Sequence, residues 1–125
     1  MALSAAALAV SEADIAAGLV LVAVDDADAA LGVAVVTLDG GSADLDALFV
    51  DPPALGRGLG RDLFVAAAGL ARRGGARRLT ILADPHAAAF YERLGARWLR
   101  NAPSDAIPGR TLPFYEYDLT SGTDP

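Results

Sequence analysis

The stretch that most constrains this chain is Leu48–Phe64, which reads LFVDPPALGRGLGRDLF. Its apolar start predicts a strand, and the two prolines that follow end it because proline cannot donate to a strand ladder. Glycines at positions 56, 58 and 60 then allow a ligand to approach the backbone closely. An amphipathic helix follows directly, and the unpaired N–H groups of its first turn favour anions. With Arg57 and Arg61 beside it, this turn is predicted to hold a phosphate or pyrophosphate.

Two common phosphate-binding loops do not fit this stretch. A Walker loop needs a lysine after its glycines, and all ten basic residues of this chain are arginines. A dinucleotide-binding loop needs a third glycine at the position of Arg61. What remains is Leu55-x-x-Gly58-x-Gly60 after a strand that ends in Val-Asp-Pro. An ordinary connection between a strand and a helix would also contain glycines, so this alternative stays open.

The composition indicates one domain and excludes several kinds of site. The chain has 125 residues, of which 54% are hydrophobic, enough for a single core. It has no cysteine and one histidine, His86, so we expect no disulfide, no thiol catalysis and no metal site. No apolar run reaches the ~18 residues of a membrane span, and the start does not resemble a signal peptide. We therefore expect a cytoplasmic protein that binds neither membranes nor nucleic acid.

The net charge of −6 is unevenly distributed. Residues 1–51 contain nine acids and no base, whereas residues 52–100 contain nine arginines and three acids. The basic part therefore starts at the predicted anion site, as an anionic ligand would favour. Exposed helix faces that simply carry arginine are the alternative for Arg72, Arg73, Arg77 and Arg78.

Hydrophobic periodicity predicts a mixed α/β (α+β) domain. Strands are expected over 19–24, 31–38, 43–50, 78–83, 96–100 and 112–119, and helices over 59–73 and 86–94. Residues 1–18 are expected to form a shortened, broken helical segment with Ser11 as a helix N-cap, and 120–125 a frayed tail. Short turns make the first three strands an antiparallel meander, and the helix over 59–73 makes the next strand parallel to 43–50.

Two segments resemble the GNAT superfamily of N-acetyltransferases. The glycine-rich turn resembles the family's acetyl-CoA loop. The run ADPHAAAFYERLGA, residues 83–96, resembles the segment after the family's fifth strand, with Ala87, Phe90, Tyr91 and Gly95 at the positions of the A-x-x-F-Y-x-x-x-G pattern. The segment 103–113 is similar to a group of small bacterial members. The resemblance covers Asp44–Leu119.

This resemblance implies a mixed, splayed sheet flanked by helices, with acetyl-CoA entering where two parallel strands part. It implies direct transfer of the acetyl group to an amine, either a small amine or a lysine side chain. The pyrophosphate would be held by the amides of Leu55, Gly56, Arg57, Gly58, Leu59, Gly60 and Arg61. Backbone N–H groups near Phe49 and Val50 would bind the pantetheine and the thioester carbonyl. Asp84 matches a position near the pantetheine, although a role as helix N-cap already explains it.

The resemblance also suggests which residues move protons. Tyr91 would protonate the departing thiolate; the alternative is a packed aromatic residue. Asp44 and Asp46 share one face of their strand by alternation, and either one, directly or through water, would take the proton of the amine. Both could equally be solvated carboxylates. The acidic first half of the chain points to a cationic acceptor.

Two departures from the family pattern limit this interpretation. Leu55 stands where the family usually has Gln or Arg. Only eighteen residues precede Leu19, so we expect the family's first strand to be missing. A partner subunit, as in a homodimer, would then complete the acceptor pocket, unless specificity is reduced or the chain is truncated. A non-catalytic acyl-CoA-binding module and an unrelated nucleotide-binding protein are the rival functions.

Overall fold

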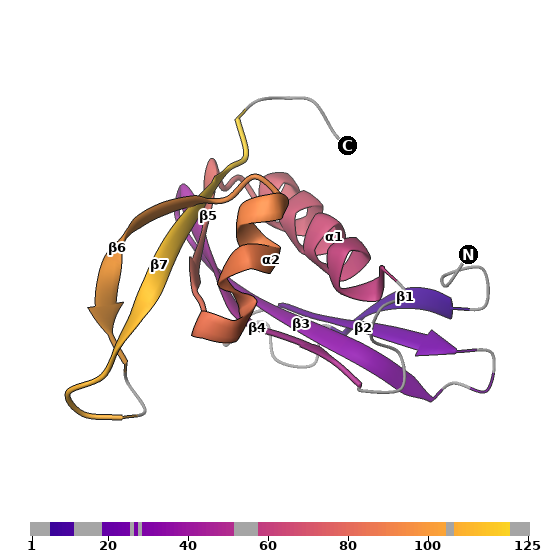
Figure 1. The fold of residues 1–125 in the computed structure, drawn as a ribbon. Helices are drawn as coiled ribbons and strands as arrows, with labels where there is room; N and C mark the ends of the chain where they lie inside the picture. Colours follow the sequence, from indigo (N-terminus) through magenta and orange to yellow (C-terminus); the bar gives the residue numbers. More distant parts are fainter. Residues whose placement is uncertain are drawn as a thin grey trace.

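The computed structural model describes residues 6–11, 19–25, 27, 29–51, 58–104 and 107–120. Within these residues one seven-stranded sheet carries two α-helices and a short 3-10 helix (Figure 1). In chain order the elements are β1 (Ala6–Ser11), β2 (Leu19–Asp25), β3 (Ala30–Asp39), β4 (Ser42–Val50), α1 (Leu59–Arg73), β5 (Arg78–Leu82), η3 (Pro85–Ala87), α2 (Ala88–Arg93), β6 (Arg97–Pro103) and β7 (Thr111–Asp118). The predicted fold class is confirmed.

The strand order is β1-β2-β3-β4-β5-β7-β6. Strands β2 to β4 form the predicted antiparallel meander, and β1 adds a strand to it that was not predicted. As predicted, β4 and β5, which precede and follow α1 in the chain, are parallel. β7 then inserts between β5 and β6, antiparallel to both. The sheet is therefore mixed, with the parallel pair near its centre.

One prediction about the N-terminal segment is wrong. Ala6–Ser11 is not helical but forms β1, which pairs with β2 along its whole length, from Ala6 opposite Asp25 to Ser11 opposite Val20. Helix propensity is only a weak preference, even for alanine, the strongest helix former, and pairing with the edge of a neighbouring strand overrides it. A first strand is thus present where none was expected. Residues 1–5 and 12–18 lie outside the described residues.

Helix α1 covers one face of the sheet and forms the core with it (Figure 1). Its buried side chains are Leu59, Leu63, Phe64, Ala67, Ala68 and Ala71. Gly32 on β3 lies under this helix: a Cβ atom there would stand 2.8 Å from Leu63 Cδ1 and 2.9 Å from the Phe49 carbonyl oxygen. The small residues therefore let the helix lie close to the sheet, which fixes where its N-terminus points.

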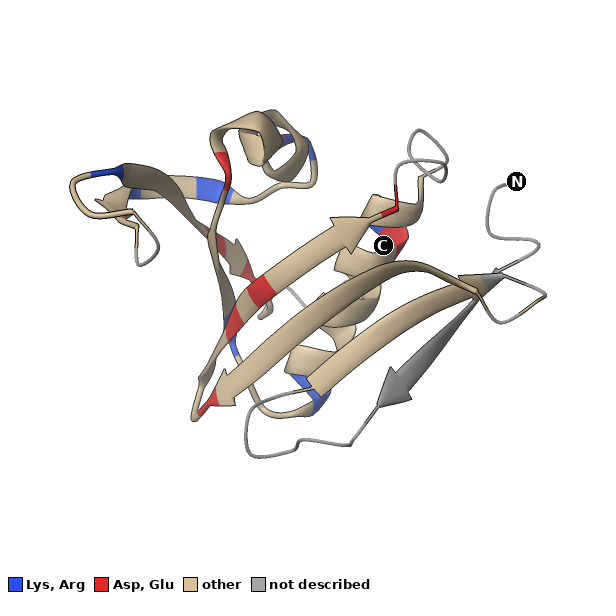
Figure 2. Ribbon diagram, turned by 90° about the horizontal axis from the view of Figure 1, so that it is seen from below, with Lys and Arg blue, Asp and Glu red and all other residues tan. Residues whose placement is uncertain are grey.

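The sheet opens between β4 and β5. Their pairing runs only from Ser42 opposite Arg78 to Leu45 opposite Ile81, whereas β4 continues to Val50. A β-bulge accompanies the opening: Leu45 pairs with Val36 and Ala47 with Val35, which leaves Asp46 as the extra residue. Bulges bend a strand and increase its twist. The two parts of the sheet consequently diverge from a common vertex, as the predicted splay requires (Figure 2).

Candidate functional site

The N-terminus of α1 lies at the open side of this split sheet. Its N-cap is Gly58, whose φ of 78° is a left-handed conformation that glycine adopts without strain. Among the residues that the structure describes, no side chain caps this end. The N–H groups of the first turn are therefore available to a ligand with negative charge. Of the predicted phosphate loop, Leu55, Gly56 and Arg57 lie outside the described residues.

A cavity of about 400 Å³ opens between this helix end, β4 and α2. It is lined by Leu48, Val50, Gly58, Leu59, Gly60, Arg61, Ala87, Phe90, Tyr91 and Arg93. A Cβ atom on Gly60 would stand 3.3 Å from Phe90 Cζ and 3.6 Å from Val50 Cγ2. The absence of a side chain at Gly60 thus leaves room inside the cavity, and the two arginines place positive charge on its wall.

The backbone of β4 presents hydrogen-bonding groups to the opening. The Asp51 N–H donates to the Leu31 carbonyl at 2.8 Å, so this pair belongs to the hydrogen-bonded positions of the β3–β4 ladder. Such positions alternate along an antiparallel pair. The N–H of Phe49, opposite Val33, therefore faces β3, while those of Leu48 and Val50 face the side from which β5 has diverged. Val50 fits the predicted backbone contact better than Phe49, whose side chain is 62% exposed outside the cavity.

Tyr91 is the buried residue of α2, a helix of only six residues. It packs against the rings of Phe90, Phe64 and Tyr115, with centroid distances of 5.1, 5.9 and 6.4 Å. Burial raises the pKa of its phenol to about 12. The hydroxyl therefore keeps its proton at neutral pH and has one to give. This position is compatible with both roles considered for Tyr91 from the sequence, a packed aromatic residue and a proton donor.

Asp44 and Asp46 lie on the opposite face of β4, as the alternation predicted. Ala43, which precedes Asp44, and Leu45, which lies between the two acids, are buried toward α1, whereas both acids are exposed. Thr80 donates a hydrogen bond to Asp44, and Thr37 donates one to Asp46. Both acids line a second cavity of about 320 Å³ with Leu45, Thr80, Leu82 and Phe114. The structure thus places the carboxylates beside the split in the sheet but not inside the cavity that contains Tyr91.

Asp84 has a local structural role. Its Oδ1 atom accepts a hydrogen bond of 2.8 Å from the His86 N–H and caps the 3-10 helix. It is not among the residues that line the 400 Å³ cavity. Arg93 and Leu48 do line it, and neither was predicted from the sequence. Their signals were the helical spacing of Arg93 from Phe90 and the strand alternation of Leu48 with Val50.

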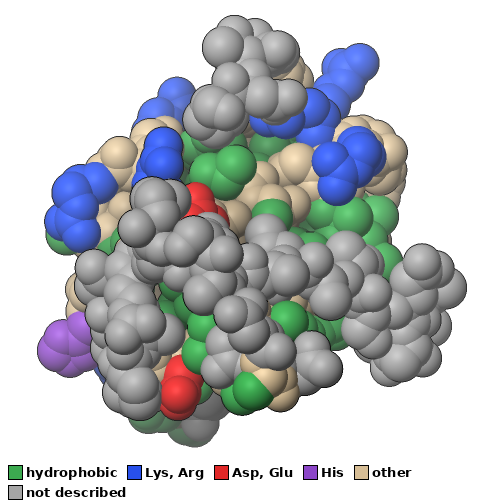
Figure 3. All heavy atoms as spheres, turned by 90° about the vertical axis from the view of Figure 1, so that its right-hand side faces the viewer, with side chains coloured by type: hydrophobic (Ala, Val, Ile, Leu, Met, Phe, Trp, Pro, Cys, Tyr) green, Lys and Arg blue, Asp and Glu red, His purple; other side chains and the backbone are tan. Residues whose placement is uncertain are grey.

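The arginines of the basic segment divide into two groups. Arg61 and Arg93 line the cavity, in agreement with an anionic ligand. Arg78, by contrast, pairs with Glu116 at 3.1 Å, and the Arg72 Nε atom donates to the Leu119 carbonyl. Arginine side chains also gather along the upper part of the face shown in Figure 3. Part of the positive charge of residues 52–100 therefore forms contacts within the protein or lies on the surface away from the cavity.

No helix in the described part of the chain is both long enough and apolar enough to cross a membrane. A comparison with functionally curated sequences gives no significant match. A family model described as an acetyltransferase (GNAT) domain matches residues 16–95, which contain the glycine-rich turn, α1, β5 and α2.

Solved structures with the same fold agree with this match. A GNAT-family protein from Desulfovibrio desulfuricans has a TM-score of 0.73 and 26% identity, over 83% of this chain and 70% of that one. Nourseothricin acetyltransferase has a TM-score of 0.75 and 19% identity, over 92% and 85%. A GNAT-family acetyltransferase from Elizabethkingia anophelis with acetyl-CoA bound has a TM-score of 0.74 and 11% identity, over 91% and 98%.

The family match covers the elements that build the cavity, and the solved structures share the mixed sheet in which it lies. The resemblance seen in the glycine-rich turn and in the helix of Tyr91 is confirmed. The chain belongs to the GNAT family of acetyltransferases.

Proposed function

We propose that this protein is an N-acetyltransferase that transfers the acetyl group of acetyl-CoA directly to an amine. One observation carries the proposal: the uncapped N-terminus of α1, the outward-facing amides of β4 and the buried phenol of Tyr91 all meet at one cavity. A relative from Elizabethkingia anophelis has acetyl-CoA bound. Acetyl-CoA would supply an acetyl group that is activated as a thioester.

The first-turn amides of α1 would bind the pyrophosphate, and Arg61 and Arg93 would neutralise part of its charge. Val50 would donate its N–H to the thioester carbonyl, where negative charge develops as the amine attacks. Helix N-termini and outward amides are fixed by the fold, so neither group has to reorganise during the reaction. The cavity residues therefore suit the ligand that the family implies.

The protons would move at two places. A carboxylate of the Asp44 and Asp46 pair would take a proton from the acceptor amine through water, since the pair lies on the other side of β4 from the cavity. Tyr91 would give its phenolic proton to the sulfur as the new N–C bond forms and the C–S bond breaks. A neutral amine loses one proton as it becomes the amide, and the thiolate gains one; an ammonium first releases a further proton to the carboxylate.

The proposal is tested by the release of CoA thiol in the presence of acetyl-CoA and a panel of primary amines. The chain contains no cysteine, so the protein adds no background to a thiol reagent. Tyr91→Phe should keep the thermal shift produced by acetyl-CoA and lose about 100-fold in kcat. An acetyl-CoA shift without thiol release on any amine would favour the non-catalytic acyl-CoA-binding module. A shift with ATP or NAD but not with acetyl-CoA would contradict the proposal altogether.

A further inference from the structure

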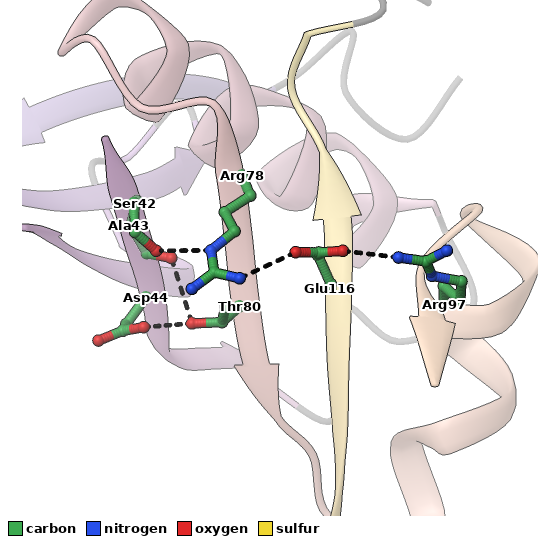
Figure 4. A network of polar contacts seen from close by, with 7 residues as sticks. All are labelled: Ser42, Ala43, Asp44, Arg78, Thr80, Arg97 and Glu116. Carbon is green, nitrogen blue, oxygen red and sulfur yellow. Dashed lines mark hydrogen bonds and ion pairs between the residues drawn. The ribbon is translucent and has the colours of Figure 1, made fainter. Parts of the chain in front are cut away.

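Two rows of side chains cross the sheet on the face that carries the acidic pair, and polar contacts occupy one of them, the closed row (Figure 4). It runs from Asp44 on β4 through Thr80 on β5 and Glu116 on β7 to Arg97 on β6. Thr80 donates to Asp44, and Glu116 accepts from Arg97 at 2.9 Å and from Arg78 at 3.1 Å. Arg78 and Arg97 therefore share Glu116 as their ion-pair partner.

The next row differs in composition and in its contacts. Leu82, Phe114 and Arg100 lie opposite one another on β5, β7 and β6, and Asp46 on β4 lines the same cavity as Leu82 and Phe114. Arg100 places its guanidinium 4.6 Å from the centroid of the Phe114 ring. Across the residues that the structure describes, neither Asp46 nor Arg100 forms an ion pair. This row therefore has an unpaired negative charge at one end, an unpaired positive charge at the other and an apolar middle.

The apolar middle of this row is accessible. Leu82 and Phe114 line the 320 Å³ cavity together with Asp46, and Leu82 is 37% exposed. In the closed row, the equivalent middle positions are the polar Thr80 and Glu116. A ligand that lies in the cavity would thus contact hydrocarbon between two opposite charges, which is an arrangement that discriminates between ligands by their charge pattern.

We propose that this open row selects an acceptor that carries an anionic group in addition to its amine, with a short apolar chain between them. This inference rests on the proposed function. The ammonium group would start near Asp46, the chain would cross Leu82 and Phe114, and a carboxylate would bind the Arg100 guanidinium, which can donate two parallel hydrogen bonds. Paired strands lie ~4.8 Å apart and β4 begins to diverge from β5 at Asp46, so at least about two strand spacings, on the order of 10 Å, separate Asp46 from the Arg100 guanidinium above Phe114. An ω-amino acid with about five methylene groups fits this spacing.

The test compares kcat/KM for three acceptors of similar length: 6-aminohexanoate, hexylamine and 1,6-diaminohexane. The wild-type protein should prefer 6-aminohexanoate over hexylamine by about fivefold, as expected for one partly exposed ion pair. Arg100→Gln should bring this ratio close to one. Arg97→Gln is the matched control, because it removes the same charge from the same strand but in the closed row, and it should keep the preference.

The outcomes separate the two proposals. Three outcomes would overturn the inference and leave the proposed function in place. These are turnover of all three amines without a preference, a preference for the diamine, and an unchanged ratio of 6-aminohexanoate to hexylamine turnover in Arg100→Gln. Loss of the ratio in both arginine variants would also overturn it, since a general effect of positive charge would then explain the preference. Absence of turnover with every amine, in a protein that acetyl-CoA stabilises, would overturn the proposed function and the inference with it.

Discussion

The hydroxyl of Tyr115 on β7 donates a hydrogen bond of 2.5 Å to the carboxylate of Glu92 on α2. Tyr115 is only 1% exposed, and Glu92 directly follows Tyr91 in the chain. The bond therefore fastens the short helix that carries Tyr91 to the sheet. The hydrogen bond to Glu92, burial and the negative charge of Glu92 together raise the pKa of Tyr115 to about 12.

Tyr115→Phe should lower the free energy of unfolding by about 2 kcal/mol, because the hydrogen bond ends on a charged group. The melting temperature should fall by several degrees. Tyr117→Phe is the control: its ring packs on Phe64 at 4.9 Å, and its hydroxyl makes no hydrogen bond within the described residues, so it should change stability by less than about 0.5 kcal/mol. Equal losses in both variants, measured by urea unfolding, would show that the Tyr115 bond does not hold α2.

Alkaline pH should destabilise the protein through its two perturbed tyrosines. Burial raises the pKa of Tyr91 to about 12, and that of Tyr115 reaches about 12 as well, against 10.0 for an ordinary tyrosine. A folded-state pKa above the unfolded one means that the folded protein binds the proton more tightly. The stabilisation that this tighter proton binding gives is fully present below pH 10 and is lost as the pH rises from 10 to 12. Unfolding free energies measured across this range should fall, and less steeply in Tyr115→Phe; parallel slopes would count against the predicted shift.

The sequence predicted the elements around the site better than the N-terminal strand, for a physical reason. The Gly58 N-cap, α1 and the helix of Tyr91 are determined by local signals: glycines, a proline and apolar spacing. The strand Ala6–Ser11 is rich in alanine and owes its conformation to pairing with β2, a partner outside its own window. The fold class and the shared face of Asp44 and Asp46 could be predicted because both follow from short connections and strand alternation.

Other features of the site depend on the register between paired strands, which cannot be read from the sequence. The bulge at Asp46 arises where Leu45 pairs with Val36 and Ala47 with Val35. The difference between the amides of Phe49 and Val50 likewise depends on which β4 residues bond to β3. Arg93 reaches the cavity because α2 packs where it does, and the position of that helix depends on Tyr115, far along the chain. These are tertiary relationships between elements that were predicted individually.

The bulge also distinguishes the two carboxylates. Asp44 lies opposite Thr80 at a position where β4 and β5 are still paired, whereas Asp46 follows the last paired residue of β4. Asp46 is therefore nearer the opening through which an amine would reach the thioester. Asp46→Asn should lower kcat/KM for the amine by about 100-fold and Asp44→Asn by less than about tenfold.

The matched pair makes this comparison specific, because each variant removes one charge and leaves one hydroxyl neighbour, Thr37 or Thr80, in place. Both variants should keep the thermal shift produced by acetyl-CoA, since neither acid lines its cavity. The reverse order of losses would move the role of proton acceptor to Asp44. Small losses in both variants would leave the two acids as solvated carboxylates.

A pair of glycine substitutions in α1 separates ligand binding from helix stability. Gly60→Ala would place a methyl group 3.3 Å from Phe90 inside the cavity, whereas Gly69→Ala would meet only the end of the flexible Arg73 side chain, at 3.4 Å. Alanine stabilises a helix interior by about 1 kcal/mol relative to glycine, so Gly69→Ala should melt at a higher temperature. Gly60→Ala should weaken acetyl-CoA binding by about tenfold, which corresponds to ~1.4 kcal/mol, while Gly69→Ala should leave the Kd within about twofold of wild type. Isothermal titration with acetyl-CoA measures both values. An unchanged Kd in Gly60→Ala would mean that acetyl-CoA does not occupy the space between Gly60 and Phe90, and the assignment of this cavity would then be wrong.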